Sequence, residues 1–209
     1  HEYVRHTHPR SVITVMRSYD LGRSWEKKEA TQVAAGGGQE FAPIDLGNGR
    51  IGAAVAAHEV APEQEADRAG LRWDHPREFP FSNVGGLWCW SDNWGLTWPL
   101  HQCILVAPGM QCCAPPVLTS DGILLMPVYG QLGRAQASSS ILYRSADGGT
   151  TWSGPVVMAR GNPGRRSYAE PALLEIVPGH LICLHRTGGS ARPGYFWQNE
   201  SRDGGETWS

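Results

Sequence analysis

An eight-residue pattern occurs four times in this chain of 209 residues. Its template is Ser-x-Asp-x-Gly-x-Thr-Trp, with Ser24 in the place of Thr in the first copy and Asn93 in the place of Asp in the second. The copies are SYDLGRSW (18–25), SDNWGLTW (91–98), SADGGTTW (145–152) and SRDGGETW (201–208). Recurrence of one template along a chain indicates an internal structural repeat, which strongly limits the folds available to it.

Each copy follows a short run of β-branched and aromatic residues, which is typical of a strand that enters a hairpin turn. In such a turn the Asp side chain can accept hydrogen bonds from backbone amides, and Gly can adopt the positive φ angle that other residues avoid. The Trp can cover the turn with its apolar face. We therefore expect structural roles for these Asp and Trp residues, and no catalytic role.

The pattern recurs at intervals of roughly fifty residues, except for a longer first interval, and a four-stranded propeller blade has about that length. A second repeated element lies between the copies and begins at Ala42, Pro115 and Glu170. It consists of an apolar run, a turn containing Gly and another apolar run, so we expect it to form the inner hairpin of a blade. The sequence thus predicts an all-β domain over residues 1–209, with about four blades.

The longer first interval comes from residues 59–83, which are rich in charged side chains and contain Pro62, Pro76 and Pro80. Proline and charge both disfavour a core strand. We interpret this segment as an inserted loop between the second and third strands of its blade. Two roles stay open for it: shaping substrate choice at the rim, or none beyond a solvated insertion.

The eight-residue pattern resembles the Asp box of sialidases and related β-propellers. This resemblance implies a six-bladed sialidase-type β-propeller, of which about four blades are present, so we expect the chain to be part of a longer protein. It also implies that the Asp boxes lie on the face opposite the active site, and it favours a secreted or periplasmic location. We expect no cofactor.

Glu170 opens the first inner strand of the last blade, and Arg186 ends the second. Because a tight hairpin joins these strands, both residues are expected at one rim, opposite the Asp boxes. In sialidases a Glu so placed helps a catalytic tyrosine act as the nucleophile, and an Arg one hairpin later binds the sialic acid carboxylate. The resemblance therefore implies a catalytic role for Glu170 and substrate binding by Arg186. A salt bridge without function is the alternative.

Arg5 has the position in the first blade that Arg186 has in the fourth, and the resemblance implies a further substrate-binding arginine there. The family places its acid Asp soon afterwards, but this chain has no Asp before Asp20. His6 and His8 are candidates for the proton donor or for rim residues, although a histidine pair in a loop is commonly solvated. The nucleophilic tyrosine and the other arginines of the family are not expected within this chain.

Further polar residues stand at the predicted rim ends of strands, where they either line a sugar pocket or are ordinary loop residues: Glu40, His58, Tyr129 and Gln131. Tyr168 is excluded as the nucleophile, because it lies only two residues from Glu170 along one strand.

The five cysteines show no C-x-x-C pairing, so we expect no structural zinc site and no other bound metal. Cys89 and Cys103 flank the second box almost symmetrically and would face each other across a hairpin. Buried thiols are the favoured interpretation for them, and a cross-strand disulfide is the alternative.

Composition excludes several classes of function. The net charge of −2, without a basic stripe, argues against nucleic acid as a partner. No apolar run approaches the ~20 residues of a membrane span. The function predicted is an exo-glycosidase that hydrolyses terminal sialic acid, or a related acidic sugar, with retention of configuration. A hydrolase or lyase acting on another polysaccharide, and a glycan- or protein-binding propeller without catalysis, are the alternatives.

Overall fold

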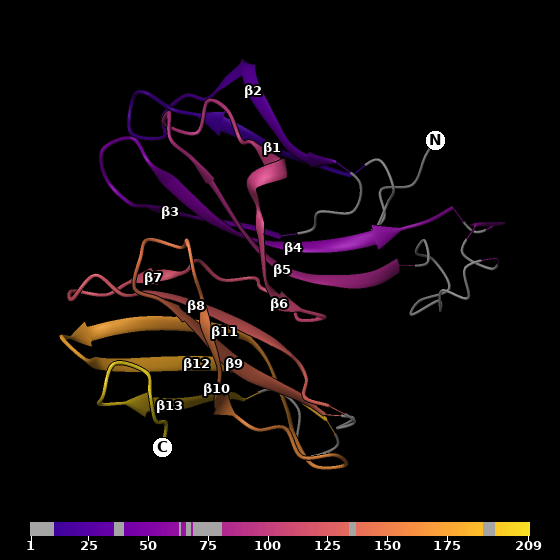
Figure 1. Cartoon of the computed structure of the whole chain (residues 1–209), viewed down its shortest axis with the longest axis vertical. Coiled ribbons are helices and arrows are strands. Elements are labelled where there is room, and N and C mark those ends of the chain that lie inside the picture. The colour runs from indigo at the N-terminus through magenta and orange to yellow at the C-terminus, as the bar shows by residue number, and fades with distance from the viewer. Residues whose placement is uncertain are drawn as a thin grey trace.

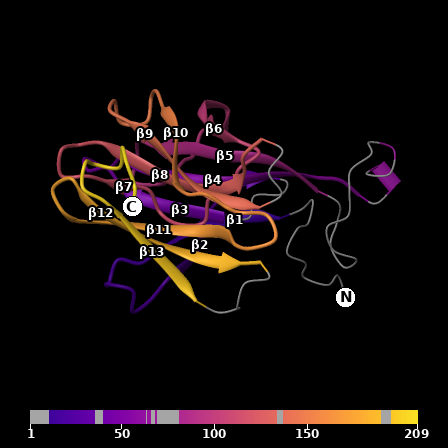
Figure 2. The same cartoon turned by 90° about the horizontal axis from the view of Figure 1, so that it is seen from below.

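The computed structural model describes residues 11–35, 40–62, 64–65, 68, 81–133, 137–189 and 195–209. Strands dominate it and form four antiparallel sheets (Figures 1 and 2). They are β1 (Val12–Arg17) and β2 (Glu26–Ala35); β3 (Glu40–Asp45), β4 (Ile51–Val60), β5 (Phe81–Ser91) and β6 (Ile104–Pro108); β7 (Val117–Leu118), β8 (Leu124–Gln131), β9 (Ser138–Ser145) and β10 (Ser153–Ala159); and β11 (Ser167–Val177), β12 (His180–Gly188) and β13 (Phe196–Ser201). A 3-10 turn, η1 (Leu100–Gln102), precedes β6.

Each sheet follows the chain, because its strands pair in sequence order. The Asp boxes lie between β1 and β2, between β5 and β6, between β9 and β10, and directly after β13. In Figure 1 β1 to β4 lie in the upper part of the view and β8 to β13 in the lower part, and β5, β6 and β7 lie between them. This confirms the predicted all-β propeller architecture with about four blades. Closure of a ring by further blades stays a prediction.

All four Asp boxes use one hydrogen-bond pattern, which the third illustrates. Ser145 Oγ donates to Asp147 Oδ1 at 2.8 Å and accepts from the Gly149 amide at 2.8 Å. Asp147 also accepts from the amide and the hydroxyl of Thr151, at 2.8 and 2.6 Å. The Trp152 indole donates to the Gly149 carbonyl at 3.0 Å. The polar side chains of the box thus form hydrogen bonds within the turn. These hydrogen bonds stabilise the hairpin turn, which is the structural role that the sequence predicts.

The second box makes the same turn without a charge. Asn93 Oδ1 accepts from the Thr97 amide at 2.9 Å, and its Nδ2 donates to Thr97 Oγ1 at 2.8 Å. Two consecutive residues of each box have positive φ, although the sequence indicated only the second of them. The first of the two is Leu21 in the first box and Trp94 in the second, each with a φ of 60°, and it is Gly in the other two boxes.

The box carboxylates should make stability depend on pH. Hydrogen bonds from the Thr151 hydroxyl and amide lower the pKa of Asp147 from 3.8 to about 2. A lowered folded-state pKa gives stability that is complete above the unfolded pKa and is lost as the pH falls from about 4 towards 2. We expect Asp147→Asn to keep the turn, as Asn93 does, and to weaken this acid dependence in thermal unfolding. Asp147→Ala is the matched control and should lower Tm at neutral pH as well; equal Tm losses in both variants would contradict the account.

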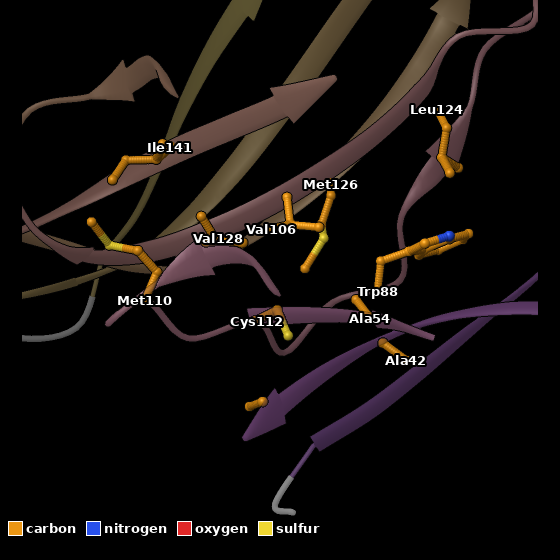
Figure 3. Packing of buried hydrophobic residues seen from close by; sticks show 12 residues of the cluster. Ala42, Ala54, Trp88, Val106, Met110, Cys112, Leu124, Met126, Val128 and Ile141 are labelled. Carbon is orange, nitrogen blue, oxygen red and sulfur yellow. The ribbon is translucent and has the colours of Figure 1, made fainter. Parts of the chain in front are cut away.

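The second and third blades pack around Trp88, whose side chain is fully buried. Its ring meets Trp152 of the third box edge-on, with 5.5 Å between centroids. The same core contains small residues of β3 and β4, and Leu124, Met126 and Val128 of β8 (Figure 3). Only glycine fits beside the indole: a Cβ at Gly52 would lie 2.0 Å from Trp88 Cη2, and one at Gly149 2.1 Å from Nε1.

The other blade interfaces are apolar too. Ile13 and Val15 of β1 pack with Val55 and Trp98 of the second blade, and Leu125 and Leu142 of the third blade pack with Leu181 and Cys183 of the fourth. The buried His185 is held by Asn199 Oδ1 at 2.8 Å, and Asn199 Nδ2 donates to the Met158 carbonyl of the third blade.

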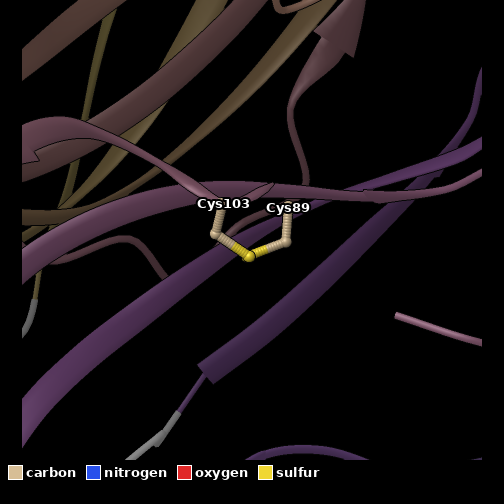
Figure 4. Close-up of a disulfide and its surroundings, with 2 residues drawn as sticks. All are labelled: Cys89 and Cys103. Carbon is tan, nitrogen blue, oxygen red and sulfur yellow. A yellow bond between two sulfur atoms is a disulfide. The ribbon is translucent and has the colours of Figure 1, made fainter. Parts of the chain in front are cut away.

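Cys89 and Cys103 form a disulfide that joins β5 to the start of β6 (Figure 4). The preference for buried thiols was therefore wrong for this pair. The physical reason is strand register: Trp88 lies opposite Ile104, so the next residues in the hairpin, Cys89 and Cys103, face each other with 4.5 Å between their Cα atoms. Cys112 and Cys183 are buried free thiols.

The first and last residues of the predicted insertion at 59–83 belong to strands, and the insertion itself stays a prediction. Val60 ends β4 and pairs with Phe81 at the start of β5, so both ends of the segment are strand. Most of the chain between these two residues lies outside the described residues. Among the residues that are described, no helix is long and apolar enough to cross a membrane.

Candidate functional site

Glu170 and Arg186 form a bidentate ion pair at one end of the fourth sheet. Arg186 Nε donates to Glu170 Oε2 at 2.6 Å, and Nη2 donates to Oε1 at 2.7 Å. Arg186 pairs with Phe196 at the start of β13, whereas Leu181 pairs with Ser201 at the start of the Asp box. The ion pair therefore lies at the rim opposite the Asp boxes, where strand counting expects both residues.

A β-bulge positions Glu170. Ala169 pairs with Arg186 and Ala172 with Leu184, so Glu170 and Pro171 together stand opposite His185. Glu170 has a φ of 48°, which is costly for a residue with a Cβ. Bulges re-aim side chains, and Pro171 tolerates the break because it has no backbone N–H to pair. Strain of this kind is often kept where a side chain has a function.

Arg186 keeps donors for a second acceptor. A guanidinium has five N–H groups in a planar fork, and Glu170 uses the Nε group and one on Nη2. The Arg186 side chain is 53% exposed, so the remaining donors can reach solvent or a ligand. The hydrogen bonds that Arg186 donates to the Glu170 carboxylate raise the pKa of Arg186. Glu170 thus holds the charged guanidinium of Arg186 in place. The free edge of this guanidinium, meaning its N–H groups that do not bind Glu170, can bind another carboxylate.

The ion pair acts electrostatically on two groups outside the fourth blade, Cys113 and Tyr129. Burial, together with the nearby carboxylates of Glu170 and Glu40, raises the pKa of the Cys113 thiol to about 12. Burial also raises the pKa of Tyr129, on which Cys113, Glu170 and Arg186 act electrostatically. Both groups are therefore protonated at neutral pH, close to the ion pair.

Tyr129 is held in a hydrogen-bonded row. Its hydroxyl donates to Gln111 Oε1 at 2.6 Å, and Gln111 Nε2 lies 3.5 Å from His58 Nε2. His58 is buried and meets the Phe81 ring edge-on, with 5.1 Å between centroids. These contacts link the rim ends of β8 and β4 through Gln111, which follows β6, and the ring contact adds Phe81 at the start of β5.

Strand register places four further predicted rim residues at the ends of their strands that lie away from the Asp boxes: Glu40, His58, Tyr129 and Gln131. Arg5, His6 and His8 lie outside the described residues. Tyr168 packs its ring against His185 and Trp197, with centroids 5.7 and 6.3 Å away, and its exclusion as the nucleophile stays a prediction.

Sequence reasoning missed several residues of this rim: Asn83, Gln111, Cys113 and Ser138. No motif marks them, because their proximity comes from the packing of one blade on the next. In the described ranges, no group of three or more His, Cys, Asp or Glu residues could hold a metal ion.

Solved structures show the same fold. A protein of unknown function from Dyadobacter fermentans superposes over all of this chain, with a TM-score of 0.79 and 20% identity. A Hadza microbial sialidase superposes over 95% of it, with a TM-score of 0.65 and 23% identity. A sialidase from Trypanosoma rangeli, mutated to display trans-sialidase activity, superposes over 94%, with a TM-score of 0.59 and 18% identity. The chain spans 60%, 39% and 32% of these proteins, respectively.

The sequence itself matches one family model. No protein of curated function matches the chain. The model for the BNR repeat-like domain matches residues 82–209, which contain three of the four Asp boxes and both members of the ion pair. The chain therefore belongs to the family of BNR repeat-like domains and has the β-propeller fold of the sialidase superfamily.

Proposed function

We propose that this protein is a glycoside hydrolase that releases a terminal acidic sugar, such as sialic acid, from glycans. One observation carries the proposal: Glu170 holds Arg186 at the rim opposite the Asp boxes, with donors of the guanidinium still exposed. A carboxylate on the substrate is the natural partner for that free edge, because an Arg fork binds carboxylates with two parallel hydrogen bonds.

The chemistry follows the sialidase resemblance. Arg186 fixes the sugar carboxylate, and Glu170 takes a proton from a tyrosine whose oxygen attacks the anomeric carbon. The bond to the leaving oxygen breaks as an acid protonates that oxygen. Water then displaces the tyrosine, so configuration is retained. Neither the tyrosine nor the acid is assigned to a residue of the described chain.

Tyr129 and Cys113 do not supply this nucleophile in our proposal. The pKa of each is raised by burial, which disfavours the anion that would attack. The Tyr129 hydroxyl also already donates to Gln111. We assign both residues to the wall of the site.

A fluorogenic aryl α-sialoside tests the proposal with the full-length protein. We expect release of the fluorophore, with the first sugar product in the α-anomeric form by NMR. A protein that melts cooperatively yet releases nothing would contradict hydrolysis of sialosides. Because no Asp lies between Arg5 and Asp20, a different proton-transfer chemistry on another acidic polysaccharide is the second candidate, and an unsaturated product would identify a lyase.

A further inference from the structure

A chain of hydrogen-bonded polar side chains lies in the apolar interface between the third and fourth blades. His185 of β12 is fully buried, and Asn199 of β13 is 7% exposed. His185 Nε2 lies 2.8 Å from Asn199 Oδ1, and Asn199 Nδ2 donates to the Met158 carbonyl of β10. Burying polar groups costs free energy unless hydrogen bonds satisfy them, and a satisfied buried network makes its surroundings rigid. The proposed mechanism does not use this histidine.

The hydrogen bonds determine which nitrogen of His185 carries the proton. A backbone carbonyl can only accept, so Asn199 presents Nδ2 to Met158 and Oδ1 to His185. Since Oδ1 is also only an acceptor, Nε2 of His185 must be the donor. Burial lowers the pKa of His185, which keeps the ring neutral at neutral pH. Its Nδ1 then lies 3.8 Å from Sγ of Cys183, a weak donor. The imidazole is therefore held in one orientation.

His185 stands directly behind the Glu170–Arg186 ion pair. It precedes Arg186 on β12 and points into the blade interface, whereas Arg186 points to the exposed side. The two residues of the bulge, Glu170 and Pro171, together stand opposite His185 on β11. The imidazole also meets the Tyr168 ring of β11 edge-on, with 5.7 Å between centroids. One buried ring thus connects the strand that carries Glu170 with β13 and the third blade.

The bulge needs support from its surroundings. The φ of 48° at Glu170 is costly, and strain of this kind persists only where neighbouring structure fixes it. The ion pair supplies little of this support, because both side chains are largely exposed. We propose that His185 is a positioning residue: anchored to the third blade through Asn199, it fixes the bulge that holds Glu170 against Arg186. Its effect on turnover rests on the proposed function, whereas its effect on the ion pair does not.

NMR of the full-length protein tests the effect on the ion pair. The Nε–H group of Arg186 gives a signal of its own, which is assigned by its loss in Arg186→Lys and which responds to the bond with Glu170. Glu170→Ala provides the signal of the broken pair. His185→Phe keeps a buried ring without its hydrogen bonds, so we expect its Arg186 signal to move towards that of Glu170→Ala. His185→Gln can still donate to Asn199 and should restore most of the wild-type signal.

Leu181→Ala is the matched control, because Leu181 is fully buried in the same interface and on the same strand, but at the end near the Asp box. It should lower Tm and leave the Arg186 signal unchanged. Asn199→Leu, which is similar in size and lacks the hydrogen bonds, removes the anchor from another strand. It should shift the signal as His185→Phe does, and it provides the test if His185→Phe does not fold.

Turnover of the fluorogenic sialoside is measured on the same variants. His185→Phe should lower kcat/KM about tenfold, as expected for loss of about one hydrogen bond, and His185→Gln should recover most of it. An unchanged Arg186 signal in the folded His185→Phe and Asn199→Leu variants, or an equal shift in Leu181→Ala, would overturn the positioning role. A shifted signal in a protein whose wild type shows no turnover would contradict the proposed hydrolysis and leave the positioning of Glu170 standing.

Discussion

Replacing Arg186 with Ala is expected to lower kcat/KM for an acidic glycoside by at least about 100-fold. Hydrogen bonds to charged groups contribute about 1.5–3 kcal/mol each, and the free edge of the fork supplies more than one. Each 1.4 kcal/mol corresponds to about tenfold. The effect on folding should be small, because both side chains of the pair are largely exposed. Steady-state kinetics together with a thermal melt would measure both quantities.

Two further variants separate charge, geometry and general damage. Arg186→Lys keeps the charge but loses the planar fork, so its activity should lie between those of wild type and Arg186→Ala. Arg202→Ala is the matched control, because Arg202 is an exposed, ion-paired arginine of the fourth Asp box. It should leave kcat/KM unchanged. Equal activity losses in Arg202→Ala and Arg186→Ala would show that the effect is not specific to the rim.

Replacing Gly149 with Ala should destabilise the protein by about 3–5 kcal/mol, since it combines backbone strain with overpacking. Gly149 has a φ of 91°, and its new Cβ would lie 2.1 Å from the buried Trp88 indole. That is a large part of the ~5–15 kcal/mol by which domains are usually stable. Urea unfolding followed by tryptophan fluorescence would measure the loss.

Gly148→Ala isolates the backbone contribution in the same turn. Gly148 has a φ of 69°, but its Cβ would meet nothing nearer than 3.8 Å. We expect a loss of only about 1–2 kcal/mol there, from the left-handed conformation alone. If the two variants were equally stable, contact between the third Asp box and Trp88 would not be what joins the second and third blades.

The architecture was readable from the sequence because it repeats. The box residues satisfy one another within eight positions, so local pattern and local structure coincide. The pairing of Glu170 with Arg186 was also predictable, since both stand on one hairpin whose register follows from its short turn. Their role in substrate binding stays a prediction.

Features that depend on contacts between blades could not be predicted. Gln111, which follows β6, contacts both Tyr129 and His58 and so joins the rim ends of β8 and β4, which are far apart in sequence. The need for Gly149 arises from Trp88 of the preceding blade. The bulge at Glu170 has no sequence signal beyond Pro171. The Cys89–Cys103 disulfide, by contrast, follows from the register of its hairpin. The sequence analysis was wrong to prefer buried thiols for this pair over that register.

The central claim is that Arg186 binds a carboxylate of the substrate. The most direct measurement compares kcat/KM for a fluorogenic α-sialoside and for its carboxylate methyl ester, with wild-type protein and with Arg186→Ala. The account predicts that wild type strongly prefers the free acid, and that Arg186→Ala loses this preference because it loses activity on the acid but little on the ester. Equal losses on both substrates, or no preference in wild type, would contradict it.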